Sequence, residues 1–357
     1  MARDSFQITT DLRNPQHTDI IDVRSPSEFS QDHIPAAINL PVLDDDERKE
    51  VGTLHKTNAF GARKRGAALI SRNIAKHIDG PLNAKDGSFY PLIYCWRGGL
   101  RSQSLGLILA QIGFRASVLE GGYRFYRHSV LESLEELGQG MKLRILAGLT
   151  GTSKTSVLHR LEKRGLQVLD LEGLANHKGS LLGSPVDDTQ PSQKSFESRI
   201  VAALSQFDPN REVWVECESN KIGSLHTPKT LFQTMQQAPV VEIRAPIQSR
   251  VDYLLRDYRY FCEKPELLKS KVSYLAQYRS KSQIESWNHL IDQQQWSTFV
   301  AEILEYHYDP SYSRSKKRWA AKREGLFELD GLGENNLERL ADVLADKFPA
   351  HPNQPFA

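Results

Sequence analysis

Short apolar runs bounded by turn-forming residues recur along the chain and predict buried β-strands. The runs cover residues 20–23, 92–94, 117–119, 143–147, 167–171, 212–215 and 240–243. Between the runs, apolar residues recur at helical spacing, as Leu105, Leu109 and Ile112 do. Strands that alternate with helices favour parallel sheets covered by helices on both faces. The pattern therefore predicts an α/β fold.

The domain organisation follows from the places where this pattern changes. Residues 131–141 are polar, end in Gly138-Gln139-Gly140, and predict a helix and linker between a first domain, 1–130, and a second domain, 142–264. After Pro265 the strand signals stop, so residues 265–350 are predicted to be mainly helical. The polar and proline-containing residues 351–357 are predicted to form a disordered tail.

Composition narrows the class of protein only slightly. Lys and Arg number 46 against 44 Asp and Glu, a net charge of +2, so any surface for nucleic acid must be local. The N-terminus lacks the apolar core of a signal peptide and no apolar run is long enough to span a bilayer, so we expect no membrane association. Cys95, Cys217 and Cys262 are far apart and odd in number, which predicts neither a disulfide framework nor a zinc site. A reducing cytoplasm is the expected location.

Cys95 follows the apolar run 92–94 directly, and a helical pattern begins a few residues later. A cysteine between a strand end and a helix N-terminus meets converging backbone N–H groups, a setting that binds anions and activates thiols. The predicted anion-binding loop comprises Trp96, Arg97, Gly98, Gly99, Leu100 and Arg101. Its glycines permit a tight turn and its arginines add positive charge. These features favour a catalytic nucleophile over the alternative, a small buried hydrophobic residue at a strand end.

Several segments of the first domain resemble a rhodanese domain, in that family's order. Residues 21–24, 28–29 and 33–41 resemble its opening, residues 94–95 with 101–102 resemble its active-site loop, and residues 119–123 resemble its closing strand and turn. Ala36 stands where the family usually has glycine. The resemblance implies that sulfur or selenium moves through a persulfide or selenide on Cys95.

The length of the cysteine loop leaves an alternative open. Five residues separate Cys95 from Arg101, one more than in a typical small sulfurtransferase, and a longer loop makes a wider nest that suits a phosphate-sized anion. The same spacing marks cysteine-dependent phosphatases. A phosphatase, or a plain sulfurtransferase, with an accessory nucleotide-binding domain is therefore the alternative, although the sequence identifies no general acid.

A second loop follows the apolar run 143–147 and precedes renewed helical spacing. It resembles a Walker A phosphate loop in its strand–loop–helix context. Its predicted diphosphate-binding residues are Gly148, Thr150, Gly151, Thr152, Ser153, Lys154 and Thr155. Lys154 would neutralise the diphosphate and the Thr155 hydroxyl could reach a magnesium ion. Ser153 replaces the glycine before the lysine, which costs about 1 kcal/mol if the position needs a positive φ, but no N–H donor is lost.

Polar residues follow the next two strand runs of this domain and could hold magnesium or transfer a proton. They are Asp170, Glu172, His177, Glu216, Glu218 and Ser219. Period-two alternation places Glu216 and Glu218 on one face of their strand, at the ligand edge if the strand is parallel. The alternative for either glutamate alone is a solvated strand end.

Together these segments resemble the tRNA 2-selenouridine synthase family over most of the chain. A rhodanese-like domain joined to a P-loop domain with the segment Asp170-Leu171-Glu172-Gly173-Leu174-Ala175-Asn176-His177 is a specific combination. Asn220 stands where the family usually has arginine. The resemblance implies geranylation of 2-thiouridine at the tRNA wobble position with geranyl diphosphate, followed by replacement of the geranylthio group by selenium from selenophosphate.

The same resemblance implies which loop serves geranylation and which serves selenium exchange. Cys95 matches the family's selenium-transfer cysteine, and the P-loop would hold the diphosphate of the prenyl donor. No tightly bound cofactor is implied, and an enzyme that supplies selenophosphate is an expected partner. A non-catalytic scaffold is a further alternative, but the presence of Cys95 with its flanking arginines argues against it.

Two basic segments are candidates for contact with tRNA. The densest lies in residues 313–323, after three tyrosines, and aromatic side chains can stack on unpaired bases. Its candidate residues are Arg314, Lys316, Lys317 and Arg318. The alternative for this segment is a solvated helix face. The second segment, near the predicted domain junction, contributes Arg124 and Arg127.

Overall fold

The computed structural model describes residues 5–178, 189–216, 219–312, 317 and 320–349. The chain divides into two compact units. Unit 1 comprises Met1–Ser133 with Pro191–Ala202, and unit 2 comprises Leu134–Gln190 with Ala203–Ala357. Within the described residues, no helix combines the length and the apolar character that a membrane crossing requires.

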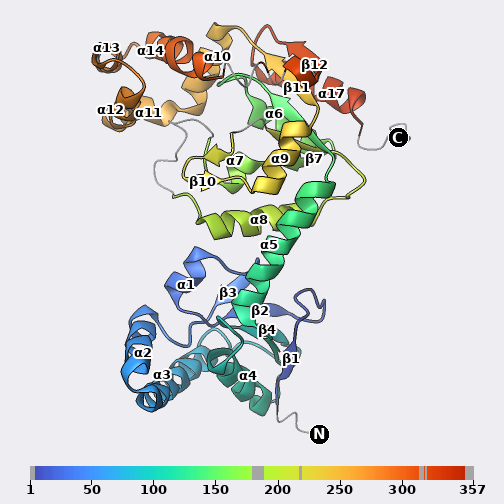
Figure 1. Cartoon of the computed structure of the whole chain (residues 1–357), viewed down its shortest axis with the longest axis vertical. Helices are drawn as coiled ribbons and strands as arrows, with labels where there is room; N and C mark the ends of the chain where they lie inside the picture. Colours follow the sequence, from blue (N-terminus) through green and yellow to red (C-terminus); the bar gives the residue numbers. More distant parts are fainter. Residues whose placement is uncertain (1–4, 179–188, 217–218, 313–316, 318–319, 350–357) are drawn as a thin grey trace. The chain divides into compact units, whose positions relative to one another are not determined.

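Unit 1 is built on a parallel five-stranded sheet (Figure 1). Its strand order is β1 (Gln7–Thr9), β5 (Ser117–Leu119), β4 (Pro91–Tyr94), β2 (Asp19–Asp22) and β3 (Ala37–Asn39). The apolar runs at 20–23, 92–94 and 117–119 correspond to β2, β4 and β5. Strands β1 and β3 were not predicted, because each has only three residues and none of them is buried.

Unit 1 also contains helices, namely α1 (Pro26–Gln31), α2 (Asp45–Thr57), α3 (Ala59–Asp79), α4 (Leu100–Ile112) and the start of α5 (Gly122–Gly140). Of these, α3 and α4 pack on the sheet. The core joins α3 and α4 to the central strands through Leu69, Leu105, Ile21 and Ile93. Residues 131–140 continue α5 without a break, so the predicted linker is helical up to Gly140.

Part of α8 (Gln193–Leu204) belongs to unit 1, although it lies within the range predicted for the P-loop domain. The reason is a buried polar contact: Asp32 accepts hydrogen bonds from Ser198 Oγ at 3.0 Å and Tyr123 Oη at 2.9 Å. Burial raises the pKa of Asp32. Arg127 also forms an ion pair with Glu197. The predicted range 142–264 therefore contains a segment, Pro191–Ala202, that packs elsewhere.

Unit 2 contains a second parallel five-stranded sheet. Its order is β12 (Arg323–Glu328), β11 (Val240–Arg244), β6 (Leu143–Ala147), β8 (Val213–Glu216) and β7 (Gln167–Leu169). Four of these strands overlap predicted runs, although β7 ends at Leu169, two residues before the end of the predicted run 167–171. Helices α6 (Lys154–Lys163) and α17 (Glu334–Lys347) pack with strand residues such as Leu146 and Val241 in one core.

A second core in unit 2 is made by helices alone (Figure 1). These are α10 (Ile247–Asp257), α11 (Arg259–Glu263), α12 (Pro265–Ser273), α13 (Lys281–Asp292), α14 (Trp296–Ile303) and the π-helical turn η2 (Leu304–Tyr308). Smaller elements complete the unit: α7 (Leu171–Leu174), α9 (Lys229–Gln237), α15 (Asp309–Ser311), the 3-10 turn η1 (Tyr274–Gln277), and the hairpin β9 (Lys221–Ile222) with β10 (Leu225–His226). The mainly helical character predicted beyond Pro265 is observed.

The prediction that strands end at Pro265 is wrong, because β12 forms the edge of the P-loop sheet. An edge strand pairs on one side only and does not need a continuous apolar run. Three of the six residues of β12 are charged, and all three form ion pairs: Arg323 with Glu242, Glu324 with Arg144, and Glu328 with Arg244. The absence of an apolar pattern therefore hid this strand.

Ala36 adopts a left-handed backbone conformation, with φ of 64°. Such a conformation costs an alanine about 1–2 kcal/mol, whereas glycine adopts it freely and loses about 0.4–1 kcal/mol through a more flexible unfolded chain. We therefore expect Ala36→Gly to raise the free energy of unfolding by up to about 1 kcal/mol, measured by chemical denaturation. The matched control is Ala37→Gly in β3, which should lower it. Equal losses in both variants would contradict the account.

Candidate functional site

Cys95 lies at the carboxyl end of β4, where the chain turns into α4. Its side chain is buried, with 4% of the residue exposed. Ser102 Oγ, in the first turn of α4, lies 3.3 Å from Cys95 Sγ and 3.1 Å from the Gly99 carbonyl oxygen. Ser102 belongs to the segment that resembles the rhodanese active-site loop, but it was not predicted to be a site residue. The structure makes it the side chain that fixes the thiol against the loop.

The first turn of α5 supports the cysteine loop through backbone hydrogen bonds. The Tyr123 backbone N–H donates to the Cys95 carbonyl at 2.8 Å, and the Arg124 N–H donates to the Trp96 carbonyl at 3.2 Å. Gly122 has φ of 58°, and a Cβ there would lie 2.3 Å from the Cys95 oxygen. Only glycine therefore allows this approach. Gly122 was missed as a site residue, although the quoted motif at 119–123 contained it.

Of the arginines in or next to the cysteine loop, one is paired with a carboxylate and two are exposed. Arg101 donates to Glu28 Oε2 at 2.7 Å. Burial alone would raise the pKa of Glu28, but hydrogen bonding and charge from Arg101 outweigh it and leave this pKa below its ordinary value. Arg97 and Arg124 are exposed. Leu100, also in the loop, has 68% of its surface exposed.

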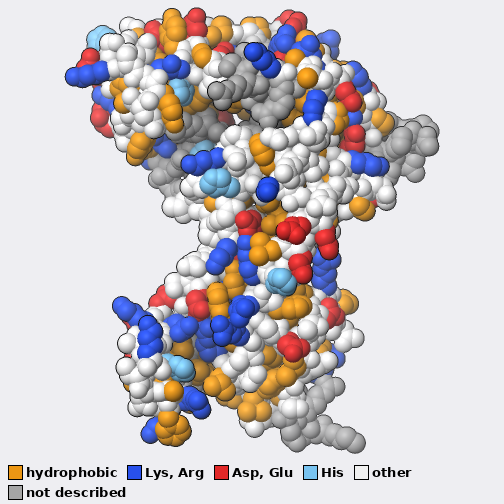
Figure 2. Space-filling model, viewed as in Figure 1, with side chains coloured by type: hydrophobic (Ala, Val, Ile, Leu, Met, Phe, Trp, Pro, Cys, Tyr) orange, Lys and Arg blue, Asp and Glu red, His pale blue; other side chains and the backbone are white. Residues whose placement is uncertain are grey.

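The other candidate tRNA contacts differ in whether they are paired, exposed or outside the described residues. Arg127 is occupied by its ion pair with Glu197 and contributes to the packing of α8. Arg314, Lys316 and Arg318 lie outside the described residues, and Lys317 is exposed. Lys and Arg side chains gather on the visible face of unit 1, in the lower part of Figure 2.

The phosphate loop connects β6 to α6. Gly148 is required by space, since a Cβ there would lie 2.5 Å from Thr152 Oγ1 and 2.9 Å from the Ile243 oxygen. Gly151 has φ of 81°. Lys154 Nζ donates to the Gly148 carbonyl at 3.1 Å, which folds the lysine back over the loop. β6 lies where the strand order reverses, between β8 and β11, which is where open α/β sheets bind ligands.

Arg250 in α10 anchors the phosphate loop to the helical region. Its Nε donates to the Thr150 carbonyl at 2.8 Å, and its terminal nitrogens pair with both carboxylate oxygens of Asp309 at 2.9 and 2.7 Å. The side chain is only 3% exposed. Both residues were missed, because a single arginine in a helix carries no signal of a partner so distant in the sequence.

Carboxylates lie beside the loop, on the side of β8. Thr155 Oγ1 donates to Glu172 Oε2 at 3.2 Å, and the Glu172 N–H donates to Glu216 Oε1 at 2.7 Å. Glu216 is fully buried, and its Oε2 has no hydrogen-bond partner among the described residues. Burial raises the pKa of Glu216 well above its ordinary value, and the charges of Asp170 and Glu172 raise it further. Asp170 accepts from the Gly173 N–H and contacts His159 at 2.8 Å.

The remaining residues predicted to hold magnesium or transfer a proton are His177, Ser219 and Glu218. Burial lowers the pKa of His177, and the charge of Lys271 lowers it further. Ser219 is exposed, and its hydroxyl donates to the Lys221 carbonyl at 2.5 Å. Glu218 lies outside the described residues. Among the described residues, the hydrogen bonds of the Ser219 hydroxyl are to Lys221 and not to the carboxylates around Glu172.

A pocket of about 480 Å³ unites most of the predicted phosphate-site residues. Its lining includes Thr150, Gly151, Ser153, Lys154, Thr155, Asp170, Glu172 and His177. Gly148, Thr152 and Glu216 do not line it. The pocket combines a lysine and a loop suited to anions with carboxylates suited to a cation, an arrangement that fits a diphosphate.

Ser153 has φ of 64°. The position therefore has the positive φ at which serine is less favourable than glycine. We expect Ser153→Gly to remove a strain of about 1 kcal/mol while keeping every N–H donor. Affinity for diphosphate, measured by calorimetry, should be equal or slightly better. A clear loss of geranyl diphosphate affinity would show instead that the serine hydroxyl is a ligand.

Comparison with known proteins places both sites in families. Residues 8–128 match the model of the rhodanese-like domain, and residues 141–282 match that of the tRNA 2-selenouridine synthase AAA domain. A tRNA 2-selenouridine synthase from Shewanella frigidimarina is 36% identical over 67% of this chain, and the match spans 65% of that protein, less than two thirds of its length. Proteins of the same name from Shewanella loihica and Pseudomonas syringae pv. tomato are 32% and 31% identical. They match over 82% and 90% of this chain and 86% and 95% of their own. The chain belongs to the tRNA 2-selenouridine synthase family.

Proposed function

We propose that this protein is a transferase that converts 2-thiouridine at the wobble position of tRNA into 2-selenouridine. The observation that carries the proposal is the presence, in one chain of this family, of a cysteine loop on a rhodanese-like sheet and a diphosphate-shaped pocket on a P-loop sheet. We place the reaction in the cytoplasm.

The first step would be geranylation at the P-loop. The sulfur of 2-thiouridine attacks the first carbon of geranyl diphosphate, the carbon–oxygen bond breaks, and diphosphate leaves with the electron pair. Lys154 and the N–H groups of the loop would stabilise that leaving charge. The pyrimidine ring loses its N3 proton, so the S-geranyl product is neutral.

The second step would be selenium exchange at the cysteine loop, which we expect to hold selenophosphate. Selenium bonds to the ring carbon and geranylthiol is released, while water cleaves the phosphorus–selenium bond to give phosphate. Selenium keeps its electron pair throughout, so no oxidant is needed. An enzyme that supplies selenophosphate is the proposed partner.

Magnesium fits the P-loop site as an accompanying ion. Thr155 and Glu172 would hold it, with Glu216 behind them. The buried Glu216 Oε2, which has no hydrogen-bond partner in the described part of the chain, is a group that a nearby cation stabilises. Among the described residues no three His, Cys, Asp or Glu side chains form a metal site, so the diphosphate would supply the remaining ligands. Bound magnesium would neutralise part of the diphosphate charge.

The direct test is mass analysis of tRNA nucleosides from cells that lack this protein. Loss of 2-selenouridine and of geranylated 2-thiouridine, with recovery on re-expression, is the expected result. The basic face of unit 1 and the exposed Arg97 and Arg124 support tRNA as the substrate. Unchanged nucleosides together with phosphatase activity of the purified protein would favour the phosphatase alternative.

A further inference from the structure

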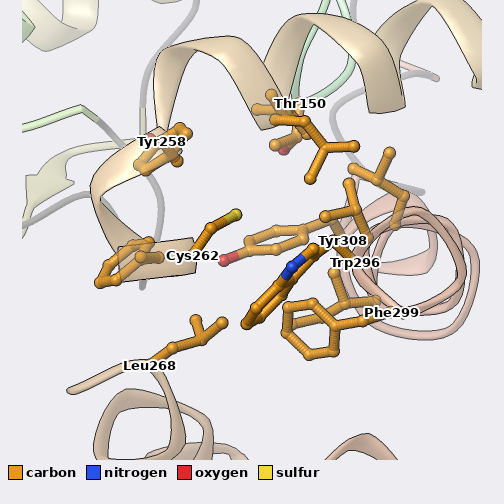
Figure 3. A pocket seen from close by; sticks show the side chains of 13 residues that line it. Thr150, Tyr258, Cys262, Leu268, Trp296, Phe299 and Tyr308 are labelled. Carbon is orange, nitrogen blue, oxygen red and sulfur yellow. The ribbon is translucent and has the colours of Figure 1, made fainter. Parts of the chain in front are cut away.

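An apolar cavity of about 60 Å³ lies among α10, α11, α12, α14 and η2 (Figure 3). Most of its 13 lining residues are aliphatic or aromatic, among them Leu268, Trp296 and Phe299. The hydroxyl groups among its lining residues belong to Thr150, from the phosphate loop, and to Tyr258 and Tyr308. The cavity is therefore suited to hydrocarbon and offers little to a sugar or other polar group.

The cavity adjoins the phosphate pocket. Thr150, Leu254 and Tyr258 line both spaces. In Figure 3, Thr150 lies at one side of the cavity and Leu268 at the opposite side, with Cys262, Trp296 and Tyr308 between them. A ligand with its anionic group at Lys154 would thus have an apolar space directly beside that group.

The phosphate pocket and the adjoining apolar cavity together indicate the class of ligand. A diphosphate pocket beside an apolar cavity suits an amphiphile with a charged head and a hydrocarbon tail, because apolar surface gains free energy when it leaves water. A nucleotide would place its ribose hydroxyls where few hydrogen-bonding partners exist, and unpaired polar groups oppose binding.

We propose that this cavity receives part of the geranyl chain of the diphosphate donor, since about 60 Å³ is too small for the whole chain, and that its walls select the chain length. The inference rests on the proposed function, since it names the subsite that holds the prenyl chain. Cys262 and Leu268 are the positions that test it best. Cys262 is half-buried on the cavity wall, and Leu268 is buried opposite Thr150.

The first experiment fills the cavity. Calorimetry with the full chain compares Cys262→Trp with Cys262→Ala, using geranyl diphosphate and inorganic diphosphate as probes. We expect the tryptophan to weaken geranyl diphosphate binding by more than about tenfold, since displacing even one methylene from an apolar pocket costs about 10–200-fold. Inorganic diphosphate should bind both variants within about twofold of the unaltered protein.

The second experiment enlarges the cavity. Leu268→Ala opens space opposite Thr150 and should shift the preference between farnesyl and geranyl diphosphate towards farnesyl by about tenfold. The matched control is Val272→Ala. Val272 belongs to the same helical core but does not line the cavity, so this variant should keep the preference unchanged.

The outcomes separate this inference from the proposed function. Equal loss of geranyl and inorganic diphosphate binding in Cys262→Trp, or an unchanged chain preference in Leu268→Ala, would overturn the chain subsite. So would tighter binding of ADP than of geranyl diphosphate by the unaltered protein. Selective chain binding without any transfer to tRNA would instead keep the subsite and reject the proposed geranylation.

Discussion

Lys154→Ala will slow geranyl transfer to tRNA about a hundredfold while sparing selenium exchange. Negative charge builds on the bridging oxygen of the diphosphate as the carbon–oxygen bond breaks, so a fixed cation acts most strongly at the transition state. Removing one preorganised contact of this kind typically costs about 3 kcal/mol. Lys154 is already oriented over the loop by its contact with the Gly148 carbonyl.

The assay gives the variant two tRNAs in parallel, one with 2-thiouridine and one already geranylated. Lys163→Ala, at the other end of the same helix and outside the pocket lining, is the matched control and should keep both rates. Normal geranylation by Lys154→Ala would remove the lysine from the mechanism. Loss of both reactions would indicate a shared tRNA site or a folding defect.

Cys95→Ser should abolish formation of 2-selenouridine and leave geranylation at the rate of the unaltered protein. The substitution changes one atom in a buried position, so the loop should keep its shape, while the hydroxyl cannot ionise as a thiol does and therefore cannot replace the thiolate in the loop expected to hold selenophosphate. The two products can be quantified from the same digest by nucleoside mass analysis.

Ser71→Ala provides the control for this experiment, because it removes one oxygen from an exposed side chain of α3 in unit 1 and leaves the cysteine loop intact. It should still form 2-selenouridine. If folded Cys95→Ser also fails to geranylate, the division of labour between the two loops is wrong. If it still forms 2-selenouridine, Cys95 has no role in the exchange.

The sequence predicted the elements whose signal is local. The runs at 117–119 and 143–147 match their strands residue for residue, because central strands of parallel sheets are buried on both faces. Strands β1, β3 and β12 stand at or near sheet edges and have too few buried residues to produce such a run. Their pairing depends on partners that the sequence does not identify.

The same distinction applies to the sites. The residues around Cys95 and Lys154 are contiguous, so each loop could be recognised from its own few residues. Arg250 and Asp309 meet at the phosphate loop from positions 59 residues apart, and Ser198 meets Asp32 across 166. Neither pair has a local pattern that would have revealed it.

The position of β12 has a consequence for synthesis on the ribosome. This strand completes the P-loop sheet from residues 323–328, and Asp309 anchors the loop through Arg250. Both therefore emerge long after Lys154 itself has been translated. Unit 1, apart from Pro191–Ala202, has all of its strands by Leu119, and domains generally fold as units as they appear. The cysteine loop is thus assembled first, and the diphosphate loop only after Asp309 and β12 have emerged.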